Sequence, residues 1–339
     1  MIASEQQLEE VLSEPSQADA RAMAEMLGDL IILGVGGKMG PSLAKRAKRA
    51  CERAKFPKRI IGVARFSDPA VRQDLESAGI ETISADLLAP GALAALPDAP
   101  NVLYMAARKF GSTGAEHLTW AMNTLLPALV ADRYAASRIV AFSTGNVYPL
   151  VPVGQGGASE EMPTEPVGEY AQSALGRERI FQFFSKRNQT PVTLLRLNYA
   201  IDLRYGVLLD IGQKVFERRP IDVTMGHVNV IWQGDANSIA LRSFGLAQSP
   251  PVVLNVTGPE TVPVRWIARG FGERFGVEPI LEGTEAATAL LSNAGRCHKL
   301  FGYPSVTLEQ MIAWVSDWIG MGGATLAKPT HFETRDGRF

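Results

Sequence analysis

A run of glycines near the amino terminus is the part of this sequence with the clearest chemical use. Gly34, Gly36, Gly37 and Gly40 follow directly on the apolar segment 30–33. Glycine lets a backbone approach a pyrophosphate closely and bend sharply beneath it. A helix that begins at such a turn offers free N–H groups and a partial positive charge to the anion. The glycines therefore predict a phosphate-binding turn, although a plain strand-to-helix turn would explain them too.

The segments on either side of the glycines predict the strand and the helix that such a turn needs. The residues before it are continuously apolar. Apolar residues then recur after it at helical spacing, at Met39, Leu43, Ala47 and Cys51. Strand, glycine turn and helix in this order are the context that makes the glycine pattern specific. We therefore expect Gly34, Gly37, Lys38, Met39 and Gly40 to contact a bound nucleotide.

Strand and helix patterns alternate through the first two thirds of the chain. Strands are expected at 59–64, 80–85, 101–107, 138–144 and 192–197, and helices at about 113–135 and 167–187. This alternation predicts an α/β fold, a Rossmann-type doubly wound parallel sheet. It should be followed by a smaller carboxy-terminal substrate-binding region.

The expected domains run from a helical extension to a polar tail. They are an extension at 1–27 that Pro15 splits, a dinucleotide-binding domain at 28–198, a substrate-binding region at 199–325 and a surface tail at 326–339. Residues 198–232 show few clear elements. Beyond them we expect helices at 234–248, 263–275 and 307–319, and a buried strand at 252–257.

The residue after the second expected strand bears on which dinucleotide binds. In a dinucleotide-binding fold this position meets the adenosine ribose, where an acidic residue favours NAD. Here the residue is Arg65, whose guanidinium suits a 2′-phosphate. The sequence therefore favours NADP over NAD, with a surface arginine as the alternative explanation.

Composition limits the class of protein. The chain has 339 residues, 46% hydrophobic and 20% charged, with a net charge of −1. Such a balance gives no broad surface for nucleic acid or an acidic membrane, and no apolar run approaches a membrane span. Cys51 and Cys297 are far apart and show no metal-binding spacing, so no metal is expected. Two free thiols and an acidic amino terminus indicate a cytoplasmic enzyme or binding protein.

Landmarks further along the chain follow the glycine turn in an order typical of a known family. The fifth expected strand ends in Ser143-Thr144-Gly145-Asn146-Val147-Tyr148, a helix begins with Glu169-Tyr170-Ala171, and the sixth strand ends Leu195-Arg196-Leu197-Asn198. With G-x-x-G-x-x-G through Gly34, Gly37 and Gly40, the chain resembles the extended short-chain dehydrogenase/reductase family, the NAD(P)-dependent sugar epimerases and dehydratases. The resemblance covers about residues 29–320.

This resemblance implies roles for particular residues. Thr144 takes the place of the Ser/Thr that holds the substrate oxygen, and Tyr170 that of the tyrosine that exchanges the hydroxyl proton. Further implied cofactor contacts are Asp86 and Leu87 at the adenine, Ala106 and Ala107 beside the cofactor, and Asn123 as a structural helix asparagine. The substrate would be a small sugar-like molecule. A homodimer would form through the helices at about 113–135 and 167–187.

The family's lysine is missing. It should lie one helical turn after the tyrosine, on the same side, but that residue is Ala174, and none of the seven tyrosines has a lysine four positions later. Such a lysine binds the nicotinamide ribose and lowers the tyrosine pKa from about 10. Lys109, Arg108 or His227 could take its place. Arg177, two turns on, would have to reach back.

Neutral hydrogen-bonding and aromatic residues mark the expected substrate region. We expect Asn146, Asn198, His227 and Trp232 to contact the substrate, with Tyr199, Arg204, Tyr205 and Asn229 nearby. Few basic residues cluster there, which favours a free sugar or a sugar acid over a nucleotide sugar.

Three functions remain open from the sequence. The first is an NAD(P)-dependent oxidoreductase or epimerase acting on a sugar-like alcohol or ketone. The second is a dinucleotide-binding regulatory protein without redox turnover, because Ala174 replaces the lysine. The third is a lyase or isomerase that uses tightly held NAD internally.

Overall fold

A parallel sheet forms the centre of the molecule. The computed structural model describes residues 2–109, 111, 114–328 and 330–337. Within these residues, seven strands pair in the order β12-β7-β5-β4-β1-β2-β3, all parallel. They are β1 (Leu30–Leu33), β2 (Ile60–Ala64), β3 (Glu81–Ser84), β4 (Asn101–Tyr104), β5 (Arg138–Thr144), β7 (Val192–Leu197) and β12 (Val252–Val256). The predicted doubly wound sheet is confirmed. The dinucleotide-binding domain was expected to end at residue 198, but β12, which lies beyond that residue, belongs to the sheet as well.

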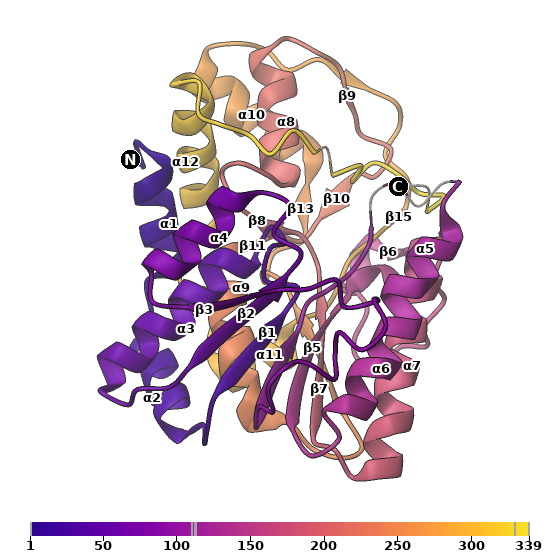
Figure 1. Cartoon of the computed structure of the whole chain (residues 1–339). Coiled ribbons are helices and arrows are strands. Elements are labelled where there is room, and N and C mark those ends of the chain that lie inside the picture. Colours follow the sequence, from indigo (N-terminus) through magenta and orange to yellow (C-terminus); the bar gives the residue numbers. More distant parts are fainter. Residues whose placement is uncertain (1, 110, 112–113, 329, 338–339) are drawn as a thin grey trace.

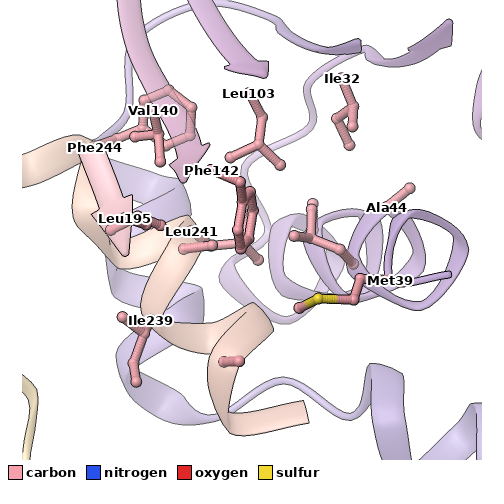
Figure 2. Packing of buried hydrophobic residues seen from close by; sticks show 14 of the residues in the cluster. Ile32, Met39, Ala44, Leu103, Val140, Phe142, Leu195, Ile239, Leu241 and Phe244 are labelled. Atoms are coloured by element: carbon pink, nitrogen blue, oxygen red, sulfur yellow. The ribbon is translucent and has the colours of Figure 1, made fainter. Parts of the chain in front are cut away.

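Helices cover both faces of the sheet (Figure 1). Strand β1 shows why: Leu30 and Ile32 pack in one apolar cluster, while Ile31 and Leu33 pack in another. Side chains alternate between the two faces of a strand, so a strand that is apolar throughout needs a cover on each side. The first face is covered by α3 (Gly40–Ala54) and α9 (Gln233–Arg242), and Figure 2 shows Phe142 of the sheet between Met39 and Ala44 on one side and Ile239 and Leu241 of α9 on the other. The second face is covered by α6 (Leu126–Arg133) and α7 (Gly168–Asn188).

The helical extension at the amino terminus is present as expected. Pro15 separates α1 (Glu5–Ser13) from α2 (Gln17–Glu25). Asp19 caps α2 through the Ser16 backbone N–H and is fully buried, where it also accepts hydrogen bonds from Arg46 of α3 at 2.7 and 2.9 Å. A buried carboxylate needs such a partner, so the extension is fixed to α3 by a specific contact.

The helix expected at 113–135 is built from three pieces. It comprises α5 (Glu116–Trp120), a π-helical turn η1 (Ala121–Leu125) and α6; Thr113 lies outside the described residues. A π-helical turn inserts an extra residue per turn and is frequent at functional sites.

Helix α4 (Pro69–Ser77) follows β2.

The carboxy-terminal half has its own apolar core. It forms mainly between α8 (Val207–Phe216), α10 (Val264–Phe275) and α12 (Leu308–Gly320). Helices α10 and α12 confirm the helices predicted at 263–275 and 307–319. Helix α9 ends at residue 242, before the expected 248. Helix α8 lies in the stretch for which few elements were expected, because Val-Leu-Leu-Asp-Ile is apolar on nearly every face and shows no clear helical period.

The other paired strands and α11 are short. They are β8 (Ala200–Ile201) paired with β11 (Ile231–Trp232), β10 (His227–Val228) with β13 (Val262–Pro263), β9 (Ile221–Asp222) with β14 (Leu281–Glu282), β6 (Val151–Pro152) with β15 (Thr288–Ala289), and α11 (Gly295–Phe301).

The tail does not lie wholly on the surface as the sequence suggested. Thr330 and Phe332 are buried, 2% and 1% exposed. Thr330 donates from its backbone N–H and its hydroxyl to Asp210 of α8, and Arg335 donates to the Thr288 carbonyl at 2.7 Å. The yellow segment in Figure 1 runs across the top of the molecule in this way. The polar composition of the tail predicted that it lies on the surface. Thr330 and Arg335 instead form hydrogen bonds with residues of the domain beneath the tail.

Candidate functional site

The glycine turn between β1 and α3 is closed so tightly that side chains are excluded from it. Gly34 has a φ of +91°, and a Cβ there would lie 2.6 Å from the Ala106 nitrogen. A Cβ on Gly40 would lie 2.0 Å from the Val35 carbonyl oxygen. The turn is closed by Gly37 N–H donating to the Gly34 carbonyl at 3.2 Å. This close packing brings β1, the turn and the start of α3 together in the arrangement that holds the pyrophosphate in dinucleotide-binding folds.

A large cavity opens in front of this turn. Its volume is about 1290 Å³, and its wall includes Gly34, Gly36, Gly37, Met39, Ala107 and Tyr170. These residues follow or lie near the carboxyl ends of parallel strands, where ligands bind in open α/β sheets. The cavity is larger than the usual range for a drug-sized ligand, as a dinucleotide together with a substrate would need.

None of the residues expected at the adenosine end, Arg65, Asp86 and Leu87, lines the cavity. Arg65 is exposed directly after β2 and is not part of the cavity wall, whereas Ser67 and Asp68 are. The chain bends at Phe66, which has a φ of +48°. Asp86 is exposed and accepts the Leu88 N–H at 3.1 Å, and neither Asp86 nor Leu87 lines the cavity. Asp68 was missed, although an acidic residue before Pro69 is a recognisable start of a helix.

Thr144 and Tyr170 lie next to each other, as the family resemblance implied, and of the two only Tyr170 lines the large cavity. Thr144 ends β5, Tyr170 lies in the first turn of α7, and their side chains are hydrogen-bonded. The Thr144 hydroxyl also accepts the Asn146 N–H at 3.2 Å. Burial raises the pKa of Tyr170 above its usual value, while the charge of Arg177 and the bond to Thr144 act in the opposite direction. The phenol is therefore protonated at neutral pH.

Ala174 is fully buried one turn after Tyr170, and cations near it come from elsewhere. Arg177 is 3% exposed, donates to the Phe142 carbonyl at 2.9 Å and to Asn123 Oδ1 at 2.8 Å, and lines the cavity. Its charge reaches Tyr170 without the side chain having to fold back, because both residues lie on the inner face of α7. Lys109 Nζ lies 5.9 Å from the centroid of the Tyr170 ring.

The other candidate cations are not at the tyrosine. Arg108 donates to the Gly111 carbonyl at 2.9 Å, and His227 lies in β10, opposite Pro263. Neither lines the large cavity.

Asn123 holds two parts of the site together. It lies in the π-helical turn η1 and is fully buried. Its side chain accepts the Arg108 N–H at 2.9 Å and donates to the Arg108 carbonyl and to the Ser173 hydroxyl, each at 2.9 Å. The loop after β4, with Ala106 and Ala107, is thereby fixed to α7 and to Tyr170.

The residues expected at the substrate divide into two groups. Asn146 and Asn198 line a smaller cavity of about 140 Å³ beside Thr144 and Tyr170, and so do Tyr199 and Tyr205. Trp232 is instead buried in the carboxy-terminal core, with its ring 5.2 Å from that of Trp314. Neither Trp232 nor His227 lines either cavity. Both short strands that carry them pack inward, which the sequence did not indicate.

Two further observations concern the described residues. None of their helices is both long and apolar enough to cross a membrane. They contain no group of three or more His, Cys, Asp or Glu side chains placed to hold a metal ion.

The fold and the glycine turn define a dinucleotide-binding α/β protein. The model of the NAD dependent epimerase/dehydratase family matches residues 30–200, and the chain belongs to this family. No curated protein sequence matches it significantly.

Solved structures of the same fold include several sugar-nucleotide enzymes. MoeE5 in complex with UDP-glucose and NAD has a TM-score of 0.70 at 17% identity, covering 87% of this chain and 99% of that one. UDP-glucuronic acid 4-epimerase from Bacillus cereus gives 0.69 at 17%, covering 86% and 99%. UDP-glucose 4-epimerase from Thermus thermophilus, in complex with NAD, gives 0.71 at 16%, covering 88% and 100%. At these identities the likeness establishes the fold.

Proposed function

We propose that this protein is an NAD(P)-dependent oxidoreductase or epimerase acting on a sugar-like alcohol or ketone, with Tyr170 and Thr144 at the reacting oxygen. The observation that carries the proposal is the position of Tyr170, which is hydrogen-bonded to Thr144: it lines both the large cavity that the glycine turn opens into and the small cavity that Thr144 lines. Family membership and sugar-nucleotide substrates in proteins of the same fold support it.

The chemistry divides between the cofactor and the protein. A bound nicotinamide would supply reversible hydride transfer, and the residues of the glycine turn would hold its pyrophosphate. Thr144 Oγ1 holds the substrate oxygen in place. Tyr170, which is protonated at neutral pH, donates its phenolic proton to a ketone oxygen as that oxygen gains charge; in the reverse direction the ionised phenol accepts the hydroxyl proton. The charge of Arg177 makes the ionised phenol less costly.

We infer that NAD binds at least as well as NADP, which revises the preference drawn from Arg65. The residues on the cavity wall directly after β2 are Ser67 and Asp68, and not Arg65. A carboxylate there favours free ribose hydroxyls and disfavours a 2′-phosphate. Fluorescence titration should give an NADH affinity equal to or above that for NADPH. An NADPH preference that disappears in Arg65→Ala would restore the original expectation.

The proposed activity is tested by substitution at the reacting pair. With sugar alcohols, sugar acids and ketoses in a nicotinamide absorbance assay, Tyr170→Phe should lower kcat by about 100- to 10,000-fold and leave NADH affinity unchanged. Thr144→Val should lower it less, and Thr144→Ser should retain most activity. Tyr303→Phe, at an exposed tyrosine away from the cavities, is the control.

The alternative is a dinucleotide-binding regulatory protein, favoured by the buried Ala174 and by the raised pKa of Tyr170. It predicts that NADH binds but that no substrate in the panel changes the absorbance. In that case Ala174→Lys should create turnover. Full activity in the wild-type protein that Tyr170→Phe removes would exclude this alternative.

We also propose that the protein forms a homodimer through the outer faces of α5, η1, α6 and α7. Large apolar side chains are exposed there, at Leu118, Leu125, Leu129 and Phe183, between 42% and 57%. Such a patch on neighbouring helices is typical of an interaction surface. A twofold axis would bring the same patch of each copy together.

A further inference from the structure

The small cavity beside the reacting pair carries Lys38 and Lys109 on its wall. Its other described lining residues include Thr144, Tyr170 and Asn146, together with residues between 197 and 207 and Thr330. Lys38, Lys109 and Tyr170 also line the large cavity, so the two spaces share these walls. The lysines are therefore placed where a substrate would extend beyond the oxygen that Thr144 and Tyr170 hold.

Lys38 belongs to the glycine turn through its backbone, but its side chain points away from the turn. Its Nζ donates to the Ala200 carbonyl at 3.1 Å and lies 3.9 Å from the centroid of the Tyr205 ring. The glycines at 34, 36 and 37 line the large cavity and not the small one. The charge of Lys38 is thus offered to the substrate side of the site.

Lys109 follows β4 and contributes from another wall. Its Nζ lies 3.5 Å from the Thr330 carbonyl and 5.9 Å from the centroid of the Tyr170 ring. Burial, together with repulsion from Lys109, lowers the pKa of Lys38 to about 7 against the attraction of Asp202. Burial likewise lowers the pKa of Lys109 to about 8. Cations held in this way gain when an anion enters between them.

The carboxylates near this cavity are bound to other groups. Both oxygens of Asp202 accept from Arg204, at 2.8 and 3.1 Å, and Asp210 accepts the backbone N–H and the hydroxyl of Thr330. Among the described residues, no carboxylate oxygen lies within 4 Å of Lys38 Nζ. None of the described residues that line the small cavity is Asp or Glu. Asp202 and Asp210 attract Lys38 without forming an ion pair with it, and burial outweighs that attraction.

We propose that Lys38 and Lys109 bind a compact anionic group of the substrate, a carboxylate or a phosphate, next to the hydroxyl or ketone held by Thr144 and Tyr170. The inference rests on the proposed function and narrows it from sugar-like alcohols to acidic ones, with a sugar acid as the simplest case. The amide groups of Asn146 and Asn198 on the same wall are suited to the remaining hydroxyls.

The test compares matched acidic and neutral ligands. The NAD-saturated protein is titrated by calorimetry at pH 6.5 and constant ionic strength with a set of stereoisomeric aldonates, and with the alditols of the same configuration. Inorganic phosphate is titrated separately as the phosphate arm. We expect at least one aldonate, or phosphate, to bind roughly tenfold or more tighter than its neutral counterpart or than chloride. Lys38→Met should remove that preference without weakening the alditol. Lys328→Met is the control, because Lys328 lines the large cavity but not the small one.

A second measurement needs no variant and so does not depend on a substituted protein folding. Acetic anhydride labels lysines of low pKa fastest, and mass spectrometry reads each site. The preferred aldonate should slow the labelling of Lys38 and Lys109, and its alditol should not. Protection by NADH alone, with no further effect of any aldonate or phosphate, would assign the lysines to the cofactor phosphates and overturn the proposal. A lack of any acidic preference would do the same.

These readouts separate the inference from the proposed function, since they measure binding without turnover. Aldonate binding through the lysines with no absorbance change in any assay would keep the anion site and contradict the redox function. Turnover of neutral sugars with no preference for their acids would keep the redox function and contradict the anion site.

Discussion

The glycine turn and the small lysine cavity adjoin each other, yet they are built in opposite ways. The turn is one continuous segment between β1 and α3, and its closure follows from glycines at fixed spacing. The small cavity takes its wall from segments that are far apart in the chain, including Lys38, Lys109, Asn198 and Thr330. A contiguous motif can be recognised from local rules, whereas an assembled cavity exists only once its segments have been brought together.

The two regions also depend on the packing of the fold in different ways. The turn presents backbone groups, and it needs close packing of β1 against the loop after β4. The small cavity buries like charges, which opposes folding unless the surrounding structure holds them in place. We therefore expect the proposed cofactor site and the proposed substrate site to respond to different substitutions.

The largest effect is expected at Gly40. A Cβ there would meet the Val35 carbonyl oxygen at 2.0 Å, so Gly40→Ala should open the turn, abolish NADH binding and destabilise the fold by about 3 kcal/mol. NADH fluorescence and chemical unfolding measure the two effects. Gly245→Ala is the matched control, since nothing lies within 4 Å of its Cβ position. Unchanged NADH affinity in Gly40→Ala would remove the turn from the cofactor site.

A smaller effect, confined to proton transfer, is expected at Arg177. Its charge lowers the pKa of Tyr170 against the effect of burial. Removing that charge in Arg177→Met should therefore raise the pKa and move the midpoint of the alcohol-oxidation rate to higher pH. Unfolding should also become easier by about 1–3 kcal/mol, because the Phe142 carbonyl and Asn123 lose a donor.

The pH–rate profile distinguishes this role from a structural one. Arg177→Lys should restore part of the wild-type midpoint. A midpoint that stays in place in Arg177→Met, with only stability lost, would show that the arginine serves packing alone.

We expect the buried Lys38 side chain at the small cavity to lower the stability of the folded protein. Its pKa is lowered to about 7, with Asp202, Lys109, Arg204 and Asp210 as the charged groups that act on it. Between pH 7 and the unfolded value of about 10.4, the unfolded chain binds more protons, so Lys38 makes wild-type stability rise with pH. Lys38→Met should raise Tm at pH 7 and flatten this rise, as measured by calorimetry from pH 6.5 to 9.5. A lower Tm at pH 7 would contradict the prediction.

The smallest effect on either cavity is expected at the exposed apolar face of α6 and α7. Phe183→Glu should convert a dimer into a monomer in light scattering and leave NADH affinity within about twofold, because neither cavity includes this face. Tyr303→Glu introduces the same charge at an exposed aromatic residue elsewhere and should leave the dimer intact. A wild-type protein that is monomeric at all concentrations would rule out the dimer.

Local rules in the sequence predicted the sheet and most helices because each depends on neighbouring residues. The break at Pro15, strands β5 and β7, and helices α10 and α12 all match. The same rules failed at α8, whose apolar residues show no period, and at the tail, where Thr330 and Phe332 turn inward. They also misplaced Arg65 and Asp86 relative to the cavity, because a bend such as that at Phe66 decides which side chain faces a ligand.

The sequence by itself predicted the glycine turn and the class of fold, because glycine spacing and strand periodicity are properties of the chain, and the family resemblance implied the pairing of Thr144 with Tyr170. It also showed that the usual lysine is absent. Only the tertiary structure decided which charges lie near Tyr170. Arg177 reaches Tyr170 along the inner face of α7, and Lys38 and Lys109 meet beside it. Coulombic effects depend on distance and burial, and those are fixed only when the helices and loops pack around the sheet.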